Sequence, residues 1–394
     1  MLLLDRPNFR RATDADKERC IDLERTAYPS PGSHADRERA LFQHPLGTID
    51  DLIVAEIDGE IMAQTQLFRL RTYWGGRPVK TGGIASVSVA PEARGRGIAG
   101  ALMEHIHLLQ DRRRAPLTML YAFRQGYYAR LGYAAASSRR RLAFDPRSIP
   151  RAWDGSVRRA RGADRAALER LFERVARASS GVHSRPKAVW DRIFANEERT
   201  LFVTDRVTGY VSFVLRQDEP HAETTLVVDE LVAADPAARR ALVGALGRMK
   251  DQVATIELEV ADGDPLERAL VDADGRRYGD AVVEHSLGEI VGGPMVRIGD
   301  LTTALEARGY LRDGSFAVEV GDERVGVRVA GGRATVLPRA SKSAPRLVTT
   351  RATLAAILYG GLGALDATAL GLAEADPRVD PVLRLPPVMP FDAF

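Results

Sequence analysis

The chain has 394 residues, and its 56 lysines and arginines against 53 aspartates and glutamates leave a net charge of +3. Chains of this length usually fold around more than one hydrophobic core, so we expect two or three domains. The near balance of charge gives no reason to expect a nucleic-acid partner. The single cysteine, Cys20, excludes an intrachain disulfide framework and fits a reducing, cytoplasmic compartment.

No segment predicts a membrane span. The opening residues MLLLDRPNFRR hold too short an apolar run for a signal peptide. The most apolar stretch, at 352–373, is interrupted by Asp366 and by four glycines. We expect core helices around a turn there, because a bilayer-spanning helix needs about 20 apolar residues in succession.

The first section of the chain predicts helices, then antiparallel strands. Apolar residues at helical spacing within 11–46 predict two short helices, separated by the turn sequence YPSPGS. Two strands follow at 51–73, joined across Asp58 and Gly59, a favoured hairpin turn, and a third strand lies at 79–91.

A second pattern of strand, loop, helix, strand and helix completes this section. Apolar residues recur at steps of four, four and three from Ile98 to Leu109, which predicts an amphipathic helix after the glycine-rich stretch at 95–100. LTMLYAF at 117–123 predicts another strand, and GYYARLGY at 126–133 predicts a short helix that ends at Gly132.

The rest of the chain predicts two further sections. A proline-rich joint at 145–156 precedes an apparent second pass of the same pattern, in which 209–216 and 225–249 echo the earlier strands and helix at low similarity. A third section begins near Glu284 and contains a hairpin around residues 321–322. The apolar ending VMPFDAF favours a docked terminus.

Gly95, Gly97 and Gly100 spell G-x-G-x-x-G between the third strand and the helix. A dinucleotide site would require an acidic residue after the next strand, and none follows LTMLYAF, so this interpretation is disfavoured. The favoured alternative is a loop whose backbone N–H groups face a pyrophosphate at the start of the helix. A glycine-rich helix start without a ligand is the structural alternative.

The second pass lacks this loop. Counted from the proline that begins each stretch, Arg239 corresponds to Arg94, but Leu242 corresponds to Gly97. A leucine side chain would occupy the space that a phosphate needs, so we expect the second copy to be degenerate and structural. In the first copy, the small and basic residues suited to a phosphate are Arg94, Gly95, Arg96, Gly97, Ala99 and Gly100.

These stretches resemble a known family. VSVAPEARGRGIAGALM resembles the acetyl-coenzyme A (acetyl-CoA) loop of the GNAT acyltransferase superfamily, and GYYARLGY resembles its later tyrosine motif. SVRRARGADRAALERLFERV, RPKAVWD, MVRIGDLTTALEARGY, LYGGLGALDATAL and the C-terminal Phe are similar to the Eis (enhanced intracellular survival) acetyltransferases over nearly the full length.

The resemblance implies an α/β (α+β) fold class, with tandem GNAT folds of mixed central sheets flanked by helices and a C-terminal domain like sterol carrier protein. The expected domains are a catalytic GNAT domain at 1–148, a degenerate GNAT-like domain at 149–285 and the C-terminal domain at 286–394. It also implies acetyl-CoA as co-substrate, an amine of a polyamine, an aminoglycoside or a lysine as acceptor, and a homo-hexamer.

By the same resemblance, the pantetheine arm of the cofactor pairs like an extra strand with residues 87–89, and the phosphates lie over 95–100. An amide near Val87 could then stabilise the oxyanion. The residues expected to bind the cofactor are Val87, Ser88, Val89, Arg94, Gly95, Arg96, Gly97, Ile98, Ala99, Gly100 and Phe123.

The catalytic groups are expected to be a general acid and a general base, with the substrate amine as nucleophile, because the chain has no G-x-S-x-G motif. Tyr128 matches the family's tyrosine, and a phenol with a pKa of about 10 stays protonated and can donate. A tyrosine bonded to a backbone carbonyl is the alternative. The family's base is its C-terminal carboxylate, here that of Phe394; the alternative is a tail that merely docks.

The acceptor site is expected around Glu24, Tyr28 and Ser86, although a solvated helix face would also explain Glu24. No metal site is predicted, because His105 and His107 lie two residues apart on a helix and no H-E-x-x-H occurs. A lipid-binding or coenzyme A-sensing module with a relict GNAT half is the rival function.

Overall fold

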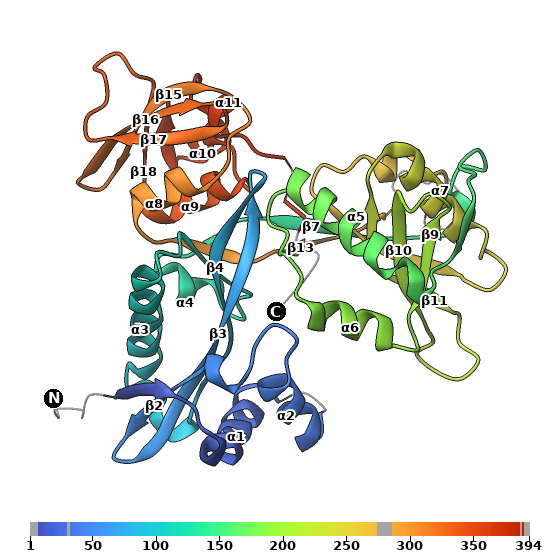
Figure 1. Ribbon diagram of the computed structural model, residues 1–394, viewed down its shortest axis with the longest axis horizontal. Coiled ribbons are helices and arrows are strands. Elements are labelled where there is room, and N and C mark those ends of the chain that lie inside the picture. The colour runs from blue at the N-terminus through green and yellow to red at the C-terminus, as the bar shows by residue number, and fades with distance from the viewer. Residues whose placement is uncertain (1–6, 30–31, 274–285, 387, 390–394) are drawn as a thin grey trace. The chain divides into compact units, whose positions relative to one another are not determined.

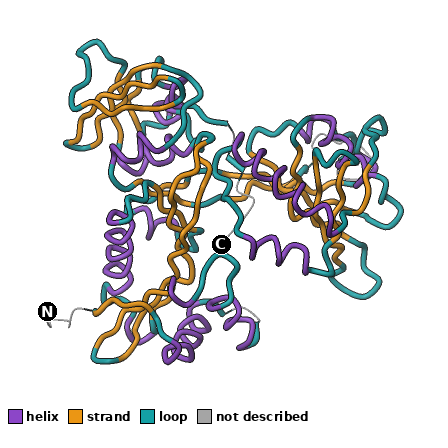
Figure 2. Tube along the Cα trace, viewed as in Figure 1, coloured by secondary structure: helices purple, strands orange, loops and turns teal. Residues whose placement is uncertain are grey.

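The structure is a computed structural model of the chain, and it describes all residues except 1–6, 30–31, 274–285, 387 and 390–394. The described residues divide into two compact units. Unit 1 takes its residues from 1–136 and 294–385, and unit 2 takes its residues from 137–293 together with Pro386, Val388 and Met389. Each unit has its own seven-stranded sheet, and a five-stranded sheet belongs to unit 1. Figure 2 shows all three sheets with helices packed beside them.

The main sheet of unit 1 has the strand order β1-β2-β3-β4-β5-β14-β6. All neighbouring strands are antiparallel except β4 and β5, which are parallel. The strands are β1 (Asn8–Arg11), β2 (Leu52–Ile57), β3 (Glu60–Trp74), β4 (Arg77–Val89), β5 (Leu117–Leu120), β14 (Met295–Ile298) and β6 (Ala134–Ala135).

Helices cover both faces of this sheet. Figure 1 shows α3 on one side of β3 and β4, and α1 with α2 on the other. At the start of α2, the side chain of Ser33 caps the helix by accepting a hydrogen bond from the Asp36 N–H. Cys20 is buried on α1. The helices are α1 (Lys17–Ala27), α2 (His34–Phe42), α3 (Ile98–Arg112) and α4 (Gln125–Ala129).

Unit 2 repeats the plan of sheet and helices. Its sheet has the order β13-β7-β12-β11-β10-β9-β8, and α7 packs against β9, β10 and β11. The elements are β7 (Ser138–Phe144), β8 (Val157–Arg159), α5 (Arg165–Ala178), α6 (Lys187–Ala195), β9 (Thr200–Thr204), β10 (Gly209–Arg216), β11 (Thr225–Ala233), α7 (Pro236–Gly247), β12 (Thr255–Ala261) and β13 (Gly288–Gly292).

The expected boundaries at 148 and 285 differ from the strand pairing. β7, which the sequence analysis placed in the first domain, lies between β12 and β13 in the sheet of unit 2. β14, expected in the third domain, lies between β5 and β6 in the sheet of unit 1. The chain therefore changes sheet at Ala136–Ser137 and at Gly293–Pro294, because β7 and β14 each complete a core that other segments began.

The remainder of unit 1 is a sheet in the order β17-β16-β15-β18-β19 with short helices. The predicted hairpin around residues 321–322 is confirmed as β15 and β16, and the apolar stretch at 352–373 forms α9 and α10 around Gly360. The elements are α8 (Leu301–Ala307), β15 (Gly314–Val320), β16 (Glu323–Ala330), β17 (Arg333–Leu337), β18 (Arg346–Thr349), α9 (Arg351–Tyr359), α10 (Ala364–Ala369), β19 (Ala373–Ala375) and α11 (Asp380–Leu383).

Candidate acetyl-transfer site

The glycine turn of unit 1 leaves the start of α3 open. Gly95 and Gly97 have φ angles of 76° and 81°, which residues with a side chain rarely adopt. Gly97 is the N-cap and offers no side chain to the helix, and the Ala101 N–H is the first to bond back, to the Gly97 carbonyl at 3.1 Å. The N–H groups of the first helical residues therefore have no carbonyl partner within the helix, and they can donate to a bound anion.

No described atom lies close to the glycines of this turn on the side where a side chain would project. A Cβ atom added to Gly95, Gly97 or Gly100 would meet no described atom within 4 Å. Packing within the protein thus gives no reason for Gly100, which lies inside a helix where alanine is more favourable. A ligand that approaches the backbone closely would explain it.

The two arginines of the turn differ in their surroundings. The guanidinium of Arg94 donates to the Val89 carbonyl at 3.2 Å and to the Thr26 carbonyl at 3.3 Å. Arg94 therefore ties the turn to the ends of β4 and α1, although we expected it to meet a phosphate. Arg96 is exposed and adds positive charge beside the helix start.

The end of β4 separates from β5. Parallel pairing between the two strands runs only from Thr81–Leu117 to Ile84–Leu120. Beyond it, a register shift opposite Thr65 and a φ of 52° at Ser86 mark a bulge in β4. The side of β4 that faced β5 has no partner strand from Ala85 to Val89 among the described residues, which leaves this edge open to a ligand strand. Two of its carbonyls, those of Val87 and Val89, already accept side-chain hydrogen bonds from Tyr28 and Arg94.

A pocket of about 300 Å³ opens at this bulge. It brings together five residues that the sequence analysis selected, namely Glu24 from α1, Tyr28 directly after α1, Ser86 and Val87 from β4, and Tyr128 from α4. The other lining residues are Ala40, His44, Gln66, Phe68, Ile84, Ala85, Leu120 and Tyr121.

Tyr128 is buried and its hydroxyl makes no hydrogen bond within the described chain. Its ring packs edge-on against Tyr127, Tyr133 and Phe123, with ring centroids 5.0, 6.1 and 6.1 Å away. Burial raises the pKa of Tyr128, so the phenol stays protonated at neutral pH. The alternative of a tyrosine bonded to a backbone carbonyl does not hold here.

Two neighbouring side chains, Tyr133 and His107, support the helix that carries Tyr128. The hydroxyl of Tyr133 and Nε2 of His107 are 3.0 Å apart, and the Tyr133 N–H donates to the Tyr128 carbonyl. Burial lowers the pKa of His107 to about 4, so the imidazole is neutral. Tyr133 and His107 are packing residues that support α4.

Glu24 does not lie on a solvated face of α1. Its carboxylate accepts a hydrogen bond from the Ser88 hydroxyl at 3.3 Å, and burial raises the pKa of Glu24. The hydroxyl of Tyr28, the residue that follows α1, donates to the Val87 carbonyl at 3.2 Å. Both side chains therefore contact the bulged part of β4.

Two predicted site residues stand apart. Phe123 is 73% exposed and touches the site only through the edge of Tyr128. Phe394 lies outside the described residues, so its carboxylate remains a prediction.

In unit 2 the corresponding helix starts differently. Asp235 caps α7 by accepting a hydrogen bond from the Ala238 N–H at 2.8 Å, and Pro236 has no N–H. The predicted match of Leu242 to Gly97 is wrong in detail: Leu242 is fully buried inside α7, because the helix begins at the proline and no loop intervenes. Arg239, the predicted match of Arg94, is on the same helix and pairs with Asp264 at 2.7 Å.

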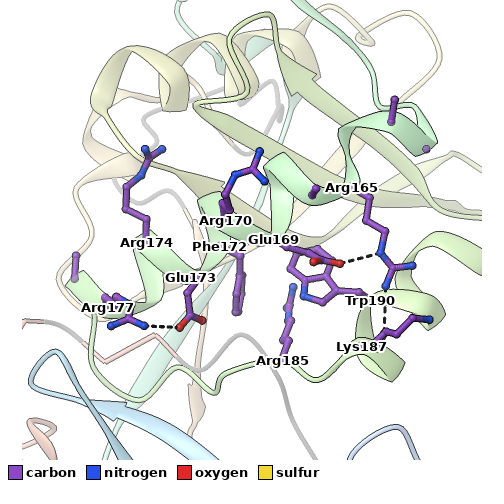
Figure 3. A pocket seen from close by; sticks show the side chains of 14 residues that line it. Arg165, Glu169, Arg170, Phe172, Glu173, Arg174, Arg177, Arg185, Lys187 and Trp190 are labelled. Carbon is purple, nitrogen blue, oxygen red and sulfur yellow. Dashed lines mark hydrogen bonds and ion pairs between the residues drawn. The ribbon is translucent and has the colours of Figure 1, made fainter.

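A larger pocket of about 1170 Å³ lies between α5 and α6 of unit 2 (Figure 3). Its aromatic residues Phe172 and Trp190 are buried, and Arg185 lies over the Phe172 ring at 3.9 Å while forming an ion pair with Glu230. Rim charges pair along α5, as Arg165 does with Glu169. These lining side chains include no cysteine, histidine, serine or tyrosine.

The described residues contain no cluster of three or more histidine, cysteine, aspartate or glutamate side chains able to hold a metal ion. None of their helices combines the length and apolar character needed to cross a bilayer.

Domain models of known families match two parts of the chain. One acetyltransferase (GNAT) domain model matches residues 8–136 and a second matches residues 181–298. An uncharacterised N-acetyltransferase of Streptomyces coelicolor is 30% identical over 311 residues, which are 72% of each chain. N-acetyltransferase Eis of Mycobacterium tuberculosis is 29% identical over 278 residues. The chain belongs to the Eis family of GNAT N-acetyltransferases.

Solved structures share the fold of this Eis-family chain. A GCN5-related N-acetyltransferase from Anabaena variabilis has a TM-score of 0.83 at 18% identity and covers 99% of this chain and 100% of its own. Eis1 from Mycobacterium abscessus has a TM-score of 0.77 at 23% identity, with 98% and 100% covered. The sequence match to Eis of M. tuberculosis spans 66% of each chain.

Sequence reasoning missed several residues of the Eis-family pocket. Gln66 accepts a hydrogen bond from the Ser86 hydroxyl at 3.2 Å, and His44 stacks on Phe68 with ring centroids 4.7 Å apart. They come from β3 and from the segment after α2, and only the alternation of β3 could have indicated that Gln66 and Phe68 share a face.

Proposed function

We propose that this protein transfers the acetyl group of acetyl-CoA directly to a primary amine, of a small polyamine or aminoglycoside-like molecule or of a lysine. GNAT acetyltransferases use acetyl-CoA, and both matched domain models are of this class. The observation that carries the proposal is the combination, within unit 1, of an uncapped glycine turn, a strand edge without a partner and a protonated tyrosine.

The glycine turn is proposed to bind the diphosphate of the coenzyme through the N–H groups of residues 98–100. The free edge of β4 is proposed to pair with the pantetheine arm, which would bring the thioester to the bulge at Ser86 and Val87. A backbone N–H at this bulge can then stabilise the oxyanion that forms on attack. The Tyr128 hydroxyl, free of other hydrogen bonds in the described chain, would protonate the departing thiolate.

The remaining inferences come from the family resemblance. The carboxylate of Phe394 is proposed as a general base, supplied by the chain terminus. A homo-hexamer, a cytoplasmic location and a sterol-carrier-like C-terminal section stay predictions. The domain scheme is proposed in revised form, with the sheet changes at 136–137 and 293–294 as its boundaries.

The proposal is tested by following thiol release with acetyl-CoA and a panel of primary amines. Amine-dependent release and a stoichiometric acetamide product are expected. Binding of acetyl-CoA without acetylation of any amine would favour the rival function of a coenzyme A sensor. Binding of a fatty acid or sterol without affinity for acetyl-CoA would favour a lipid-binding module.

The role of Phe394 has its own test. A variant with a few extra C-terminal residues should keep its affinity for acetyl-CoA and lose turnover if the terminal carboxylate takes part. Unchanged turnover in the extended variant would remove Phe394 from the mechanism.

A further inference from the structure

Positive charge is concentrated in the part of unit 2 that runs from β8 to the end of α6. Of the 56 lysines and arginines in the chain, ten lie within residues 157–195, and of the 53 aspartates and glutamates only four do. The positive charges in this stretch exceed the negative ones, while the rest of the chain is slightly negative. A local field of one sign attracts a partner of the opposite sign even when the whole protein is nearly neutral.

The four acidic side chains of this stretch are all paired within it. Arg165 contacts acidic groups on both α5 and α6, so it also ties the two helices together. The remaining positive charge is therefore not neutralised by the stretch itself. The four pairs are Arg158 with Asp164 at 2.8 Å, Arg165 with Glu169 at 2.8 Å, Arg165 with Asp191 at 2.7 Å and Arg177 with Glu173 at 3.1 Å.

Arg170 and Arg174 carry charge that no described residue balances. Neither guanidinium group makes a hydrogen bond or an ion pair with the described chain. The two residues are one helical turn apart, and Figure 3 shows their side chains on the same side of α5, away from Phe172. Both are exposed.

These two arginines belong to a straight row on the surface of α5. In steps of four residues the row contains Ala166, Arg170, Arg174 and Ala178, and all four are exposed and line the pocket between α5 and α6. The row spans about 18 Å along the helix. Because alanine side chains are short, the two guanidinium groups stand open to a partner that lies along the row.

The packing of unit 2 gives the row no role of its own. The buried residues of α5, Leu168, Leu171, Phe172 and Ala176, lie on the other side of the helix and already join it to the core. An exposed arginine without a partner contributes little to stability. The arginines of the row are therefore free to serve an interaction.

The surroundings of the row select the chemistry of the partner. Phe172 and Trp190 are only 2% and 4% exposed, so they offer no open ring on which a nucleic-acid base could stack. A small anion on an exposed row would stay largely in water, where salt screens its attraction. A protein segment with several carboxylates can meet successive arginines, and each guanidinium can donate two parallel hydrogen bonds to a carboxylate.

We propose that the row of Ala166, Arg170, Arg174 and Ala178 on α5 is a docking surface for an acidic segment of a partner protein. The proposal goes beyond acetyl transfer and does not depend on it, because the row belongs to unit 2 and the candidate acetyl-transfer site belongs to unit 1. It assigns unit 2 a role in recognition, although the helix start of α7 is closed to a coenzyme.

The test measures binding of a labelled glutamate-rich peptide to the full chain by fluorescence anisotropy at low salt. The peptide has about 16 residues, long enough to span the row. The double variant Arg170→Gln with Arg174→Gln should raise its dissociation constant about 10-fold, as loss of two exposed charge pairs does. The matched control is Arg206→Gln with Arg240→Gln, which removes two exposed charges of unit 2 outside the stretch and should bind like the native protein.

Reversal of charge sharpens the test. Arg170→Glu with Arg174→Glu should abolish binding of the glutamate-rich peptide and create affinity for a lysine-rich peptide of the same length, which the native protein should not bind. An unchanged thermal unfolding midpoint shows that each variant is folded. If the reversal variant does not fold, the glutamine variant still decides the question.

Four results would overturn the proposal. They are no binding of the glutamate-rich peptide by the native protein, an equal loss in the control variant, tighter binding of a DNA oligonucleotide of equal charge that depends on Arg170 and Arg174, and displacement of the peptide by inorganic phosphate at low concentration. The last two would assign the row to a nucleic acid or to a small anion. None of them bears on acetyl transfer, because the measurement follows peptide binding alone.

Discussion

The helices α3 and α7 occupy equivalent places in the two units but begin in opposite ways. Before α3, Gly95 and Gly97 take positive φ angles and leave the first N–H groups of the helix without a side-chain cap. Before α7, the carboxylate of Asp235 already accepts one of those hydrogen bonds, and Pro236 removes another donor. A helix start can thus serve an anionic ligand or its own stability, because the same few donors cannot serve both.

The two pockets show the same contrast. In unit 1, the pocket at the bulge exposes a phenol without a hydrogen-bond partner in the described chain and a carboxylate held by one hydroxyl. In unit 2, the lining of the larger pocket includes ion pairs, such as Arg165 with Glu169, and the guanidinium of Arg185 stacked on the Phe172 ring. The size of a pocket is therefore a poorer guide to chemistry here than the unused capacity of its polar groups.

The largest expected effect comes from giving α3 the carboxylate that α7 has. Gly97→Asp should raise the dissociation constant for acetyl-CoA by about 1000-fold, since a like charge beside the diphosphate costs several kcal/mol. Titration calorimetry measures this change. Gly59→Asp is the matched control, because Gly59 has a φ of 80°, also with nothing near its added Cβ, and lies in the turn between β2 and β3. Equal loss in both variants would point to backbone strain instead of the anion site.

The next effect concerns the phenol of unit 1. Tyr128→Phe should lower kcat by about 100-fold and leave the affinity for acetyl-CoA unchanged, because the ring packing stays and only the proton donor is lost. Steady-state kinetics with one amine measure it. The neighbouring Tyr127→Phe should have less than a 3-fold effect, and the same loss in both variants would mean that either hydroxyl merely supports the packing of α4.

In unit 2, removal of the cap should affect stability alone. Asp235→Ala should lower the free energy of unfolding by about 1 kcal/mol, as loss of an N-cap does. Urea denaturation measures this change, and acetyl transfer should be unaffected. A new affinity for coenzyme A in this variant would show that the cap alone had closed a second site.

The smallest expected effect comes from adding one methyl group at the start of α3. Gly100→Ala should raise the free energy of unfolding by about 0.5–1 kcal/mol, because glycine disfavours helix and the added Cβ meets no described atom. Its affinity for acetyl-CoA should fall, since the methyl group would stand where the diphosphate approaches. Thermal unfolding measures the change in stability, and calorimetry on the same preparation measures the change in affinity for acetyl-CoA. Tighter binding of acetyl-CoA would contradict a close approach of the phosphate to Gly100.

Several features of the site follow from local patterns in the sequence. The G-x-G-x-x-G spacing predicted an open helix start between a strand and a helix, and the apolar steps after Ile98 predicted α3. LTMLYAF predicted β5, but the strand ends at Leu120, because β4 turns away there and pairing stops. That separation depends on the bulge at Ser86, for which the sequence carries no glycine or other signal.

Long-range pairing could not be predicted in the same way. β7 and β14 are ordinary strands in the sequence, and each pairs with strands that lie far from it in the chain. The surroundings of Glu24 also could not be predicted, since its spacing on α1 suits either a solvated or a buried face. Only the position of β4 against α1 decides between them.

The account depends most on where the coenzyme binds, and a crystal structure of the full chain with acetyl-CoA tests this directly. We expect its diphosphate on the N–H groups of residues 98–100, its pantetheine arm along β4 from Val87 to Val89, and its thioester near the Tyr128 hydroxyl. A coenzyme found instead at the start of α7, or in the pocket between α5 and α6, would contradict the account.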